Sequence, residues 1–156
     1  VRLTTFVEDA DLVGIFGDHR VNKWPSLGDV NGTDNIPVVR LSEMYLNRAE
    51  ARAQTGNDGG AAGDLDMIVQ RANPAAPASA LTGAALLDEI KNERRRELYG
   101  EGHRVFDLTR YQQDLVRGAD CTSTVCTVPY PDPRFILPIP LEEMDVNPNM
   151  VQNPGY

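Results

Sequence analysis

The stretch Glu93–Arg110 constrains the fold of this chain more than any other part. It reads ERRRELYGEGHRVFDLTR and places five arginines, four acids and a histidine among apolar residues at helical spacing. Residues 91–110 carry six basic and four acidic residues, a balance of +2 in a chain whose net charge is −8. Because the same helical stretch holds Leu98 and Phe106, these charges cannot all face water, and buried charges need partners. The stretch is therefore either a structural ion network or an active site.

The excess of arginine favours the ion network. Glu93 and Glu97 lie one helical turn apart and suggest the paired carboxylates of a glycosidase. Arginine neighbours lower the pKa of a carboxylate, however, whereas a general acid needs a raised pKa. We expect one of these two acids to pair with Arg104 or Arg110, and Asp107 to pair with Arg94 or Arg95. The predicted network comprises Glu93, Arg94, Glu97, Glu101, Arg104, Asp107 and Arg110.

The remaining periodicity predicts a mainly α fold. Helices are expected over residues 39–55, 61–72, 83–99 and 104–113, with Thr82 as the N-cap of the third. The Gly-rich turn 56–60, the prolines at 74 and 77 and the glycines at 100 and 102 separate them. On the first helix, one stripe is formed by Leu41, Met44, Tyr45, Arg48 and Ala49. Two antiparallel pairs joined by short turns predict α-α hairpins in a tetratricopeptide-like arrangement.

Both ends of the chain are expected to be irregular. Residues 1–36 show no helical period and form a lead-in to the helical pairs at 37–113. Residues 114–156 contain seven prolines, but Tyr130, Phe135 and Ile136 make them too apolar for a disordered tail. We expect a long extended strap lying on the helices, with one helical turn near residues 141–145. At 156 residues, a single domain is the default.

Composition and motifs exclude several classes of function. The net charge of −8 and the pI near 4.7 argue against general binding to nucleic acid or to an anionic membrane. Two cysteines and two distant histidines make no zinc pattern, and no cofactor fingerprint is present. His103 has no serine or cysteine nucleophile near it in the sequence, so no catalytic residue is predicted. Cys121 and Cys126 form either a disulfide or two free thiols, and the sequence leaves both open.

Trp24 and Tyr130 are the candidate ligand-binding residues. The single tryptophan offers a flat face on which a sugar ring can stack, and its neighbours include Asp18, Arg20, Asn22, Asp29 and Asn31, whose polar groups can bond hydroxyls. Tyr130 lies in a proline-rich loop and is the weaker candidate. The alternative role for Trp24 is that of a packing anchor.

Three separated motifs resemble one known family. The order Glu-Arg-Arg-x-Glu-Leu, Glu-Gly-His-Arg and Asp-Leu-x-Arg occurs within residues 93–110. Residues 40–51 read RLSEMYLNRAEA, and residues 138–156 run from Pro-Ile-Pro through Asn-Pro-Asn to Gln-Asn-Pro-Gly-Tyr. Together they resemble the SusD/RagB family of surface glycan-binding lipoproteins over roughly residues 18–156. The resemblance also implies a SusD-like fold with helical pairs.

The resemblance carries functional expectations. It implies a non-catalytic receptor for a glycan or other nutrient, exposed at the cell outer membrane and partnered by a TonB-dependent, SusC-like transporter. Because family members are several times longer, this chain is expected to be a C-terminal portion that acts as helical scaffold. The signal and lipid-bearing cysteine would then lie upstream. The alternative is a helical protein–protein interaction module, and a glycoside hydrolase is a distant third.

Overall fold

The computed structural model describes residues 7–9, 19–21, 38–118 and 121–156. The chain forms two compact units, Val1–Gly100 and Glu101–Tyr156. The boundary falls inside the range 37–113, which the sequence analysis treated as one set of helical pairs. The single-domain organisation stays a prediction.

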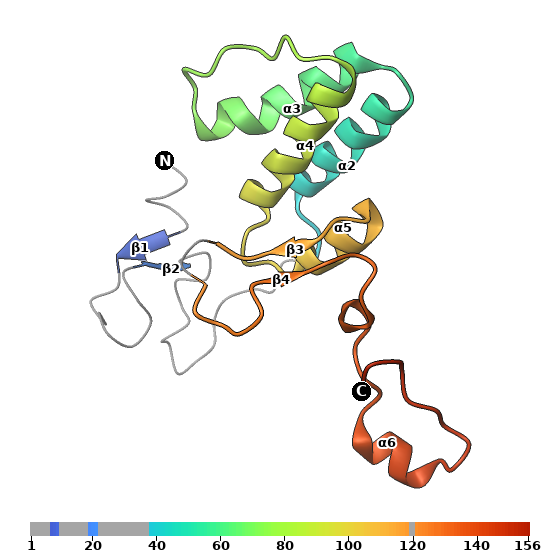
Figure 1. Cartoon of the computed structure of the whole chain (residues 1–156). Helices are drawn as coiled ribbons and strands as arrows, with labels where there is room; N and C mark the ends of the chain where they lie inside the picture. The colour runs from blue at the N-terminus through green and yellow to red at the C-terminus, as the bar shows by residue number, and fades with distance from the viewer. Residues whose placement is uncertain (1–6, 10–18, 22–37, 119–120) are drawn as a thin grey trace. The chain divides into compact units, whose positions relative to one another are not determined.

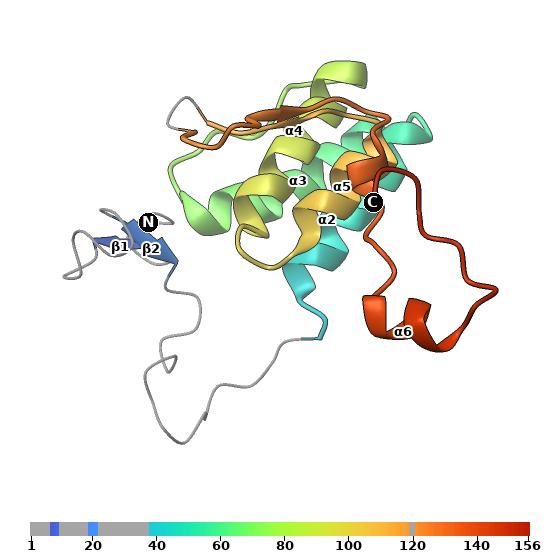
Figure 2. The same cartoon turned by 60° about the horizontal axis from the view of Figure 1, so that its bottom comes forward.

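Three helices that pack against one another dominate the first unit. They are α2 (Leu41–Gln54), α3 (Asp58–Ala72) and α4 (Gly83–Glu97). They lie together in both views of the ribbon (Figure 1, Figure 2). The unit also contains strands β1 (Val7–Asp9) and β2 (His19–Val21), which pair antiparallel with Val7 opposite Val21. The predicted mainly α fold is confirmed, and α2 and α3 form an α-α hairpin.

The turn between α2 and α3 depends on two glycines and an asparagine. Gly56 has φ +80°, a left-handed conformation that ends α2 without steric cost. The Asn57 side chain then accepts a hydrogen bond of 3.0 Å from the Gly60 backbone N–H and caps α3. A Cβ on Gly60 would lie 2.9 Å from Asn57 Oδ1, so a larger residue there would push the capping side chain aside. This cap explains why α3 begins three residues before the predicted start.

A side chain of α3 helps to start α4. Thr82 is the N-cap residue, as predicted, but its hydroxyl makes no capping hydrogen bond. Asp58 Oδ2 instead accepts a hydrogen bond of 2.8 Å from the Gly83 backbone N–H. Because Asp58 is the first residue of α3, this bond joins the beginnings of two helices. An acid at a helix N-terminus also interacts favourably with the helix dipole.

The apolar core of the first unit lies where α2, α3 and α4 meet. Its buried cluster is Ala49, Ala61, Leu65, Leu86 and Ile90. The two alanines let α2 and α3 approach closely, and each buried leucine contributes about 1.5–3 kcal/mol. Of the stripe predicted on α2, Ala49 is buried as expected, but Leu41 is 73% exposed and Met44 is exposed too, whereas Leu46 and Ser42, outside the stripe, are buried. Buried polar residues at positions 42 and 50 obscured the apolar pattern.

The second unit begins with one helix and a small hairpin. Helix α5 (His103–Tyr111) buries Leu108, and strand β3 (Leu115–Val116) pairs antiparallel with β4 (Thr127–Val128). Leu115 lies opposite Val128 in this register. Cys121 and Cys126 form a disulfide in the connection between the two strands, with their Cα atoms 5.9 Å apart. The structure thus answers the question that the sequence left open, and it adds a hairpin that the sequence did not predict.

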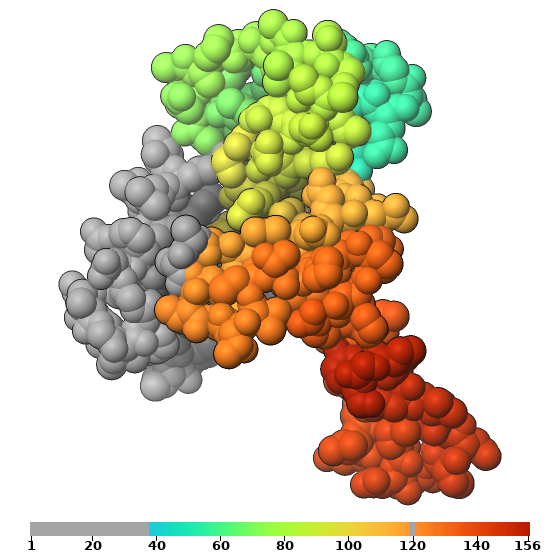
Figure 3. Space-filling view, viewed as in Figure 1, coloured from blue at the N-terminus to red at the C-terminus, as the bar shows by residue number. Residues whose placement is uncertain are grey.

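The C-terminal segment folds back on itself. It contains the 3-10 helix η2 (Pro133–Phe135) and helix α6 (Leu141–Val146), the latter matching the predicted helical turn. Gln152 exchanges two hydrogen bonds with the Ile139 backbone, at 2.8 and 2.9 Å, and the Tyr156 hydroxyl donates to Ile136 O at 2.9 Å. Figure 3 shows the last part of this segment, from α6 to the C-terminus, as a lobe coloured orange-red to dark red. That this strap lies on the helices stays a prediction.

Candidate functional site

A buried carboxylate at the end of α4 joins three parts of the first unit. The side chain of Glu97 is 0% exposed. Its Oε1 accepts a hydrogen bond of 2.6 Å from Arg71 Nη2 and one of 3.3 Å from Arg40 Nη2. Arg40 Nη2 also donates to the Glu97 carbonyl at 3.2 Å. Arg40 precedes α2, and Arg71 lies in the last turn of α3. A carboxylate removed from water in this way is stable only with cationic partners.

A second buried carboxylate joins α2 to α3. Arg48 binds both oxygens of Asp64, with Nε–Oδ2 at 2.9 Å and Nη2–Oδ1 at 2.7 Å. Arg52 Nη1 lies 2.7 Å from Asp64 Oδ2 and also donates to the Gly60 carbonyl at 3.2 Å. The two-pronged hydrogen bond to Asp64 raises the pKa of Arg48 above its ordinary value. These contacts hold the two helices of the hairpin in one register.

Two arginines on α4 make further charged contacts, Arg94 from a buried position and Arg96 from an exposed one. Arg94 is buried, and its Nη1 donates to Asn47 Oδ1 at 2.7 Å while Nη2 lies 3.8 Å from Glu43 Oε1. Arg96 Nε donates 2.9 Å to the buried Glu93, within the same helix. The charges of residues 93–97 are therefore partly inside the unit.

The structure places the predicted network residues in two groups. Glu93, Arg94 and Glu97 are buried in the first unit, and their described partners there come from α2, α3, α4 and the residue before α2. In the second unit Asp107 is buried and lies 3.2 Å from Arg110 of the same helix, and Glu101 and Arg104 are half-buried. The cross-pairs predicted between residues 93–97 and 104–110 join the two units and stay predictions.

Sequence reasoning missed several of the charged partners. The predicted ion network leaves out Arg40, Arg48, Arg52, Asp64 and Arg71. One signal was available: Asp64 lies between Ala61 and Leu65 on the apolar stripe of its helix, where an acid needs a cationic partner. No comparable signal marks Arg71.

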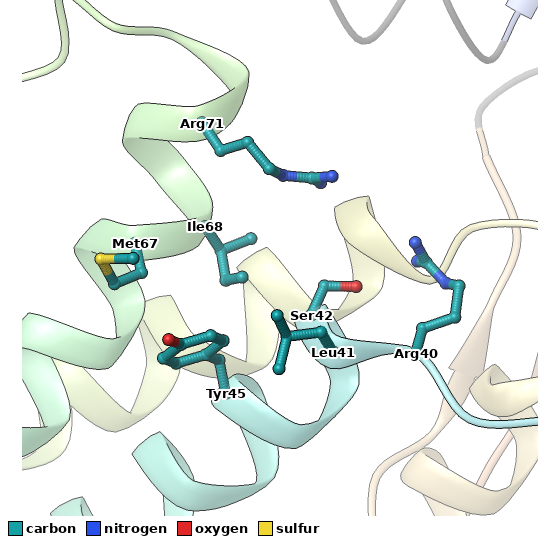
Figure 4. Close-up of a pocket in the computed structure, with 7 residues that line it drawn as sticks. All are labelled: Arg40, Leu41, Ser42, Tyr45, Met67, Ile68 and Arg71. Atoms are coloured by element: carbon teal, nitrogen blue, oxygen red, sulfur yellow. The ribbon is translucent and has the colours of Figure 1, made fainter.

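A pocket of about 420 Å³ opens between α2 and α3, and Arg40 and Arg71, the two partners of Glu97, are among its lining residues. It is lined by Arg40, Leu41, Ser42, Tyr45, Met67, Ile68 and Arg71 (Figure 4). The arginines lie on one side, and Tyr45 and Met67 lie on the other. The Ser42 hydroxyl is buried without a hydrogen-bond partner and points toward the arginine side. The pocket thus has a cationic part and an apolar part, which suits a small amphipathic ligand.

The two predicted ligand-binding aromatics lie elsewhere. Trp24 is outside the described residues. Tyr130 is half-buried in the second unit, with its ring edge-on to Phe135 at 5.6 Å between centroids and its backbone N–H bonded to Asp114 Oδ1 at 2.8 Å. This gives the Tyr130 ring a packing contact, and its role in ligand binding stays a prediction.

Neither a metal cluster nor a membrane span occurs in the described part of the chain. Residues 7–9, 19–21, 38–118 and 121–156 contain no group of three His, Cys, Asp or Glu side chains that could hold a metal ion. Among the described helices, none has the length and apolar character needed to cross a membrane.

The sequence model of one family matches most of the chain, over residues 18–156, and its description is SusD family. The chain belongs to the SusD family. The bond from Arg40 to Glu97 therefore joins two of the motifs that resemble this family, RLSEMYLNRAEA and ERRREL.

Curated relatives support the assignment at clear identity. The chain is 37% identical over 130 residues to "Starch-binding protein SusD" of Bacteroides thetaiotaomicron, covering 78% of this chain and 22% of that protein. It is 32% identical over 138 residues to "SusD-like protein P25" of Formosa agariphila, covering 81% of this chain and 26% of that protein. The chain thus spans about a quarter of the length of these relatives.

Solved structures agree with the fold of this SusD-family chain. A putative sugar binding protein from Bacteroides vulgatus matches with a TM-score of 0.75 and 41% identity, covering 89% of this chain and 33% of that one. A SusD superfamily protein from Bacteroides thetaiotaomicron matches with a TM-score of 0.72 and 35% identity, covering 88% and 32%. The SusD-like helical arrangement expected from the motifs is confirmed.

Proposed function

We propose that the protein is a non-catalytic glycan-binding receptor of a nutrient import system, with this portion as its helical scaffold. The observation that carries the proposal is the match of residues 18–156 to the SusD family. A relative named as starch-binding, at 37% identity, indicates the ligand class. The chain spans 22% of that relative, so the proposal concerns the full-length protein.

The charged clusters support a scaffold role for this portion. Arg40 and Glu97 are 57 positions apart in the sequence, and Arg71 and Glu97 are 26 apart. Bonds between such distant residues fix helix positions, which in turn fix any loops that the helices carry. The arginine-rich surroundings of Glu93 and Glu97 also suit ion pairs better than acid catalysis, which needs a carboxyl with a raised pKa.

The family assignment supports a proposal for the partner and the location of the full-length protein. We propose that the full-length protein lies on the cell outer membrane, held by a lipid anchor upstream of this chain. Its partner there would be a TonB-dependent, SusC-like transporter. Recovery of that transporter with the tagged full-length protein from detergent extracts would support the pairing, and recovery of the protein alone under conditions that keep the transporter soluble would contradict it.

Oligosaccharide binding by the full-length protein tests the proposal directly. Titration with starch-derived and other neutral oligosaccharides should give a saturable signal in calorimetry and quench tryptophan fluorescence. Prolonged incubation should produce no new reducing ends. Release of reducing ends would show that the protein is a hydrolase. Failure to bind any glycan of a broad panel would refute the proposed receptor function.

Exposed apolar side chains favour a second candidate, a helical protein–protein interaction module. Leu137 is 81% exposed, Leu141 76% and Val151 82%, all in the C-terminal segment. Such a concentration of exposed apolar residues often marks a contact with another protein. If this reading holds, the chain alone should retain a defined protein from outer-membrane extracts, and Leu137→Asp with Leu141→Asp should abolish retention. Equal retention by the double variant would refute it.

A further inference from the structure

We propose that the pocket between α2 and α3 binds a carboxylated sugar ring of the uronic-acid type. This is a second binding site, independent of the oligosaccharide site proposed above. Three features of the pocket carry the inference: a guanidinium group with donors to spare, a buried hydroxyl without a partner, and an aromatic ring on the side opposite the arginines (Figure 4).

The guanidinium group of Arg71 supplies the charge. Its side chain is 53% exposed, and its described hydrogen bond uses only Nη2, which donates to Glu97 at 2.6 Å. The remaining N–H groups of the same guanidinium are therefore available to a ligand. Arginine binds carboxylates with two parallel hydrogen bonds, so a carboxylate is the group that these donors fit best.

The hydroxyl of Ser42 supplies a second polar contact. Ser42 is only 7% exposed, and its Oγ has no hydrogen-bond partner in the structure. A buried polar atom normally finds a partner, because leaving it unpaired costs stability. Since Ser42 lines the pocket and its hydroxyl points toward the arginine side, a ligand oxygen placed there would supply the missing bond.

The opposite side of the pocket fits the apolar face of a ring. Tyr45 is half-buried, and Met67 and Ile68 continue the wall beside it. Arg48 lies over the Tyr45 ring at 5.3 Å from its centroid, which helps to fix the ring. A volume of about 420 Å³ lies within the usual range of small-ligand pockets and accommodates a monosaccharide unit. A six-membered ring with one carboxylate matches both sides of the pocket, because the carboxylate fits the arginine side and the ring fits the apolar side.

Direct titration of the full-length protein with D-glucuronate, D-glucose and benzoate tests this assignment. We expect saturable binding of glucuronate, and at least tenfold weaker binding of glucose because it lacks the carboxylate. Tighter binding of benzoate than of glucuronate would overturn the sugar and indicate an aromatic acid. Absence of glucuronate binding, with a neutral oligosaccharide still bound, would overturn the inference while leaving the proposed function intact.

Ser42→Ala is the sharpest variant because the hydroxyl has no partner in the fold. Removing it should leave the melting temperature unchanged or slightly raised, yet weaken glucuronate binding on the order of tenfold through the lost hydrogen bond to a charged group. Tyr45→Leu should weaken binding similarly by removing the ring face. Ser123→Ala, at an exposed position in the second unit, is the control and should leave the glucuronate affinity unchanged. Equal affinity for glucuronate in Ser42→Ala and the control would refute the site.

Discussion

Replacing Glu97 with glutamine tests whether the buried ion cluster holds the helices together. The substitution keeps the shape of the side chain and removes the charge that Arg40 and Arg71 share. Breaking a fully buried ion pair costs about 3–5 kcal/mol, whereas an exposed pair contributes less than about 1 kcal/mol. The Glu97 carboxylate is 0% exposed, but the two arginines are 26% and 53% exposed and stay partly hydrated without it. We therefore expect a loss of about 2–3 kcal/mol in the free energy of unfolding.

Chemical denaturation at 25 °C, followed by circular dichroism, measures this loss. Glu89→Gln is the matched control, because Glu89 lies on the same helix and pairs with Arg96 at partly exposed positions, 36% and 48%. It should cost less than about 1 kcal/mol. A double-mutant cycle with Arg71→Gln should then show a coupling of about 1–2 kcal/mol to Glu97. If Glu97→Gln and Glu89→Gln agree within about 0.5 kcal/mol, the buried cluster does not stabilise the fold and the reasoning is wrong.

Three further changes probe other contacts. Asn57→Ala removes the cap of α3 and should lower the free energy of unfolding by about 1 kcal/mol in the same denaturation experiment. Asn57→Asp keeps an acceptor for the Gly60 N–H and should lower it much less. Equal losses in the two variants would contradict the cap. Asp64→Asn removes a buried charge that Arg48 and Arg52 share, so the rate of amide hydrogen exchange should rise throughout α2 and α3. Unchanged exchange rates would show that these ion pairs do not stabilise the hairpin. The hydrogen bonds from the Arg134 side chain and backbone lower the pKa of Asp132 from 3.8 to about 2. Because the folded pKa is the lower one, the stabilisation is complete above about pH 4 and is lost as the pH falls toward 2. An NMR titration should place the Asp132 midpoint near pH 2, and Arg134→Gln should move it back toward 3.8; a midpoint near 3.8 in the parent protein would refute the pairing.

Local signals predicted the helices because their causes are local. Gly56, Asn57, Pro74 and the glycines near residue 100 act through the conformation of their own backbone or of the next turn. Helices α2, α3 and α4 accordingly begin and end within about three residues of the predicted positions. The β3–β4 hairpin escaped prediction because two-residue strands are too short to show an alternating pattern.

The partners of the charges could not be predicted in the same way. A helical period shows which residues share a face, but it does not show which face meets which neighbour. Arg71 is 26 positions from Glu97 and appears in the sequence as an ordinary basic residue at the end of a helix. The pocket has the same origin, since Ser42 and Arg71 come together only when α2 packs against α3.

The sequence by itself determined the family, the helical segments and the need to bury part of the charge at residues 93–97. These follow from motif order, periodicity and the presence of charges on an apolar helix, all of which can be read from the linear sequence. Tertiary structure alone decided that Glu97 is held by Arg40 and Arg71, that Asp64 is held by two arginines of α2, and that a pocket opens beside them. The physical reason is that helix packing selects among many arginines of equal charge by their distance in space, which sequence separation does not encode.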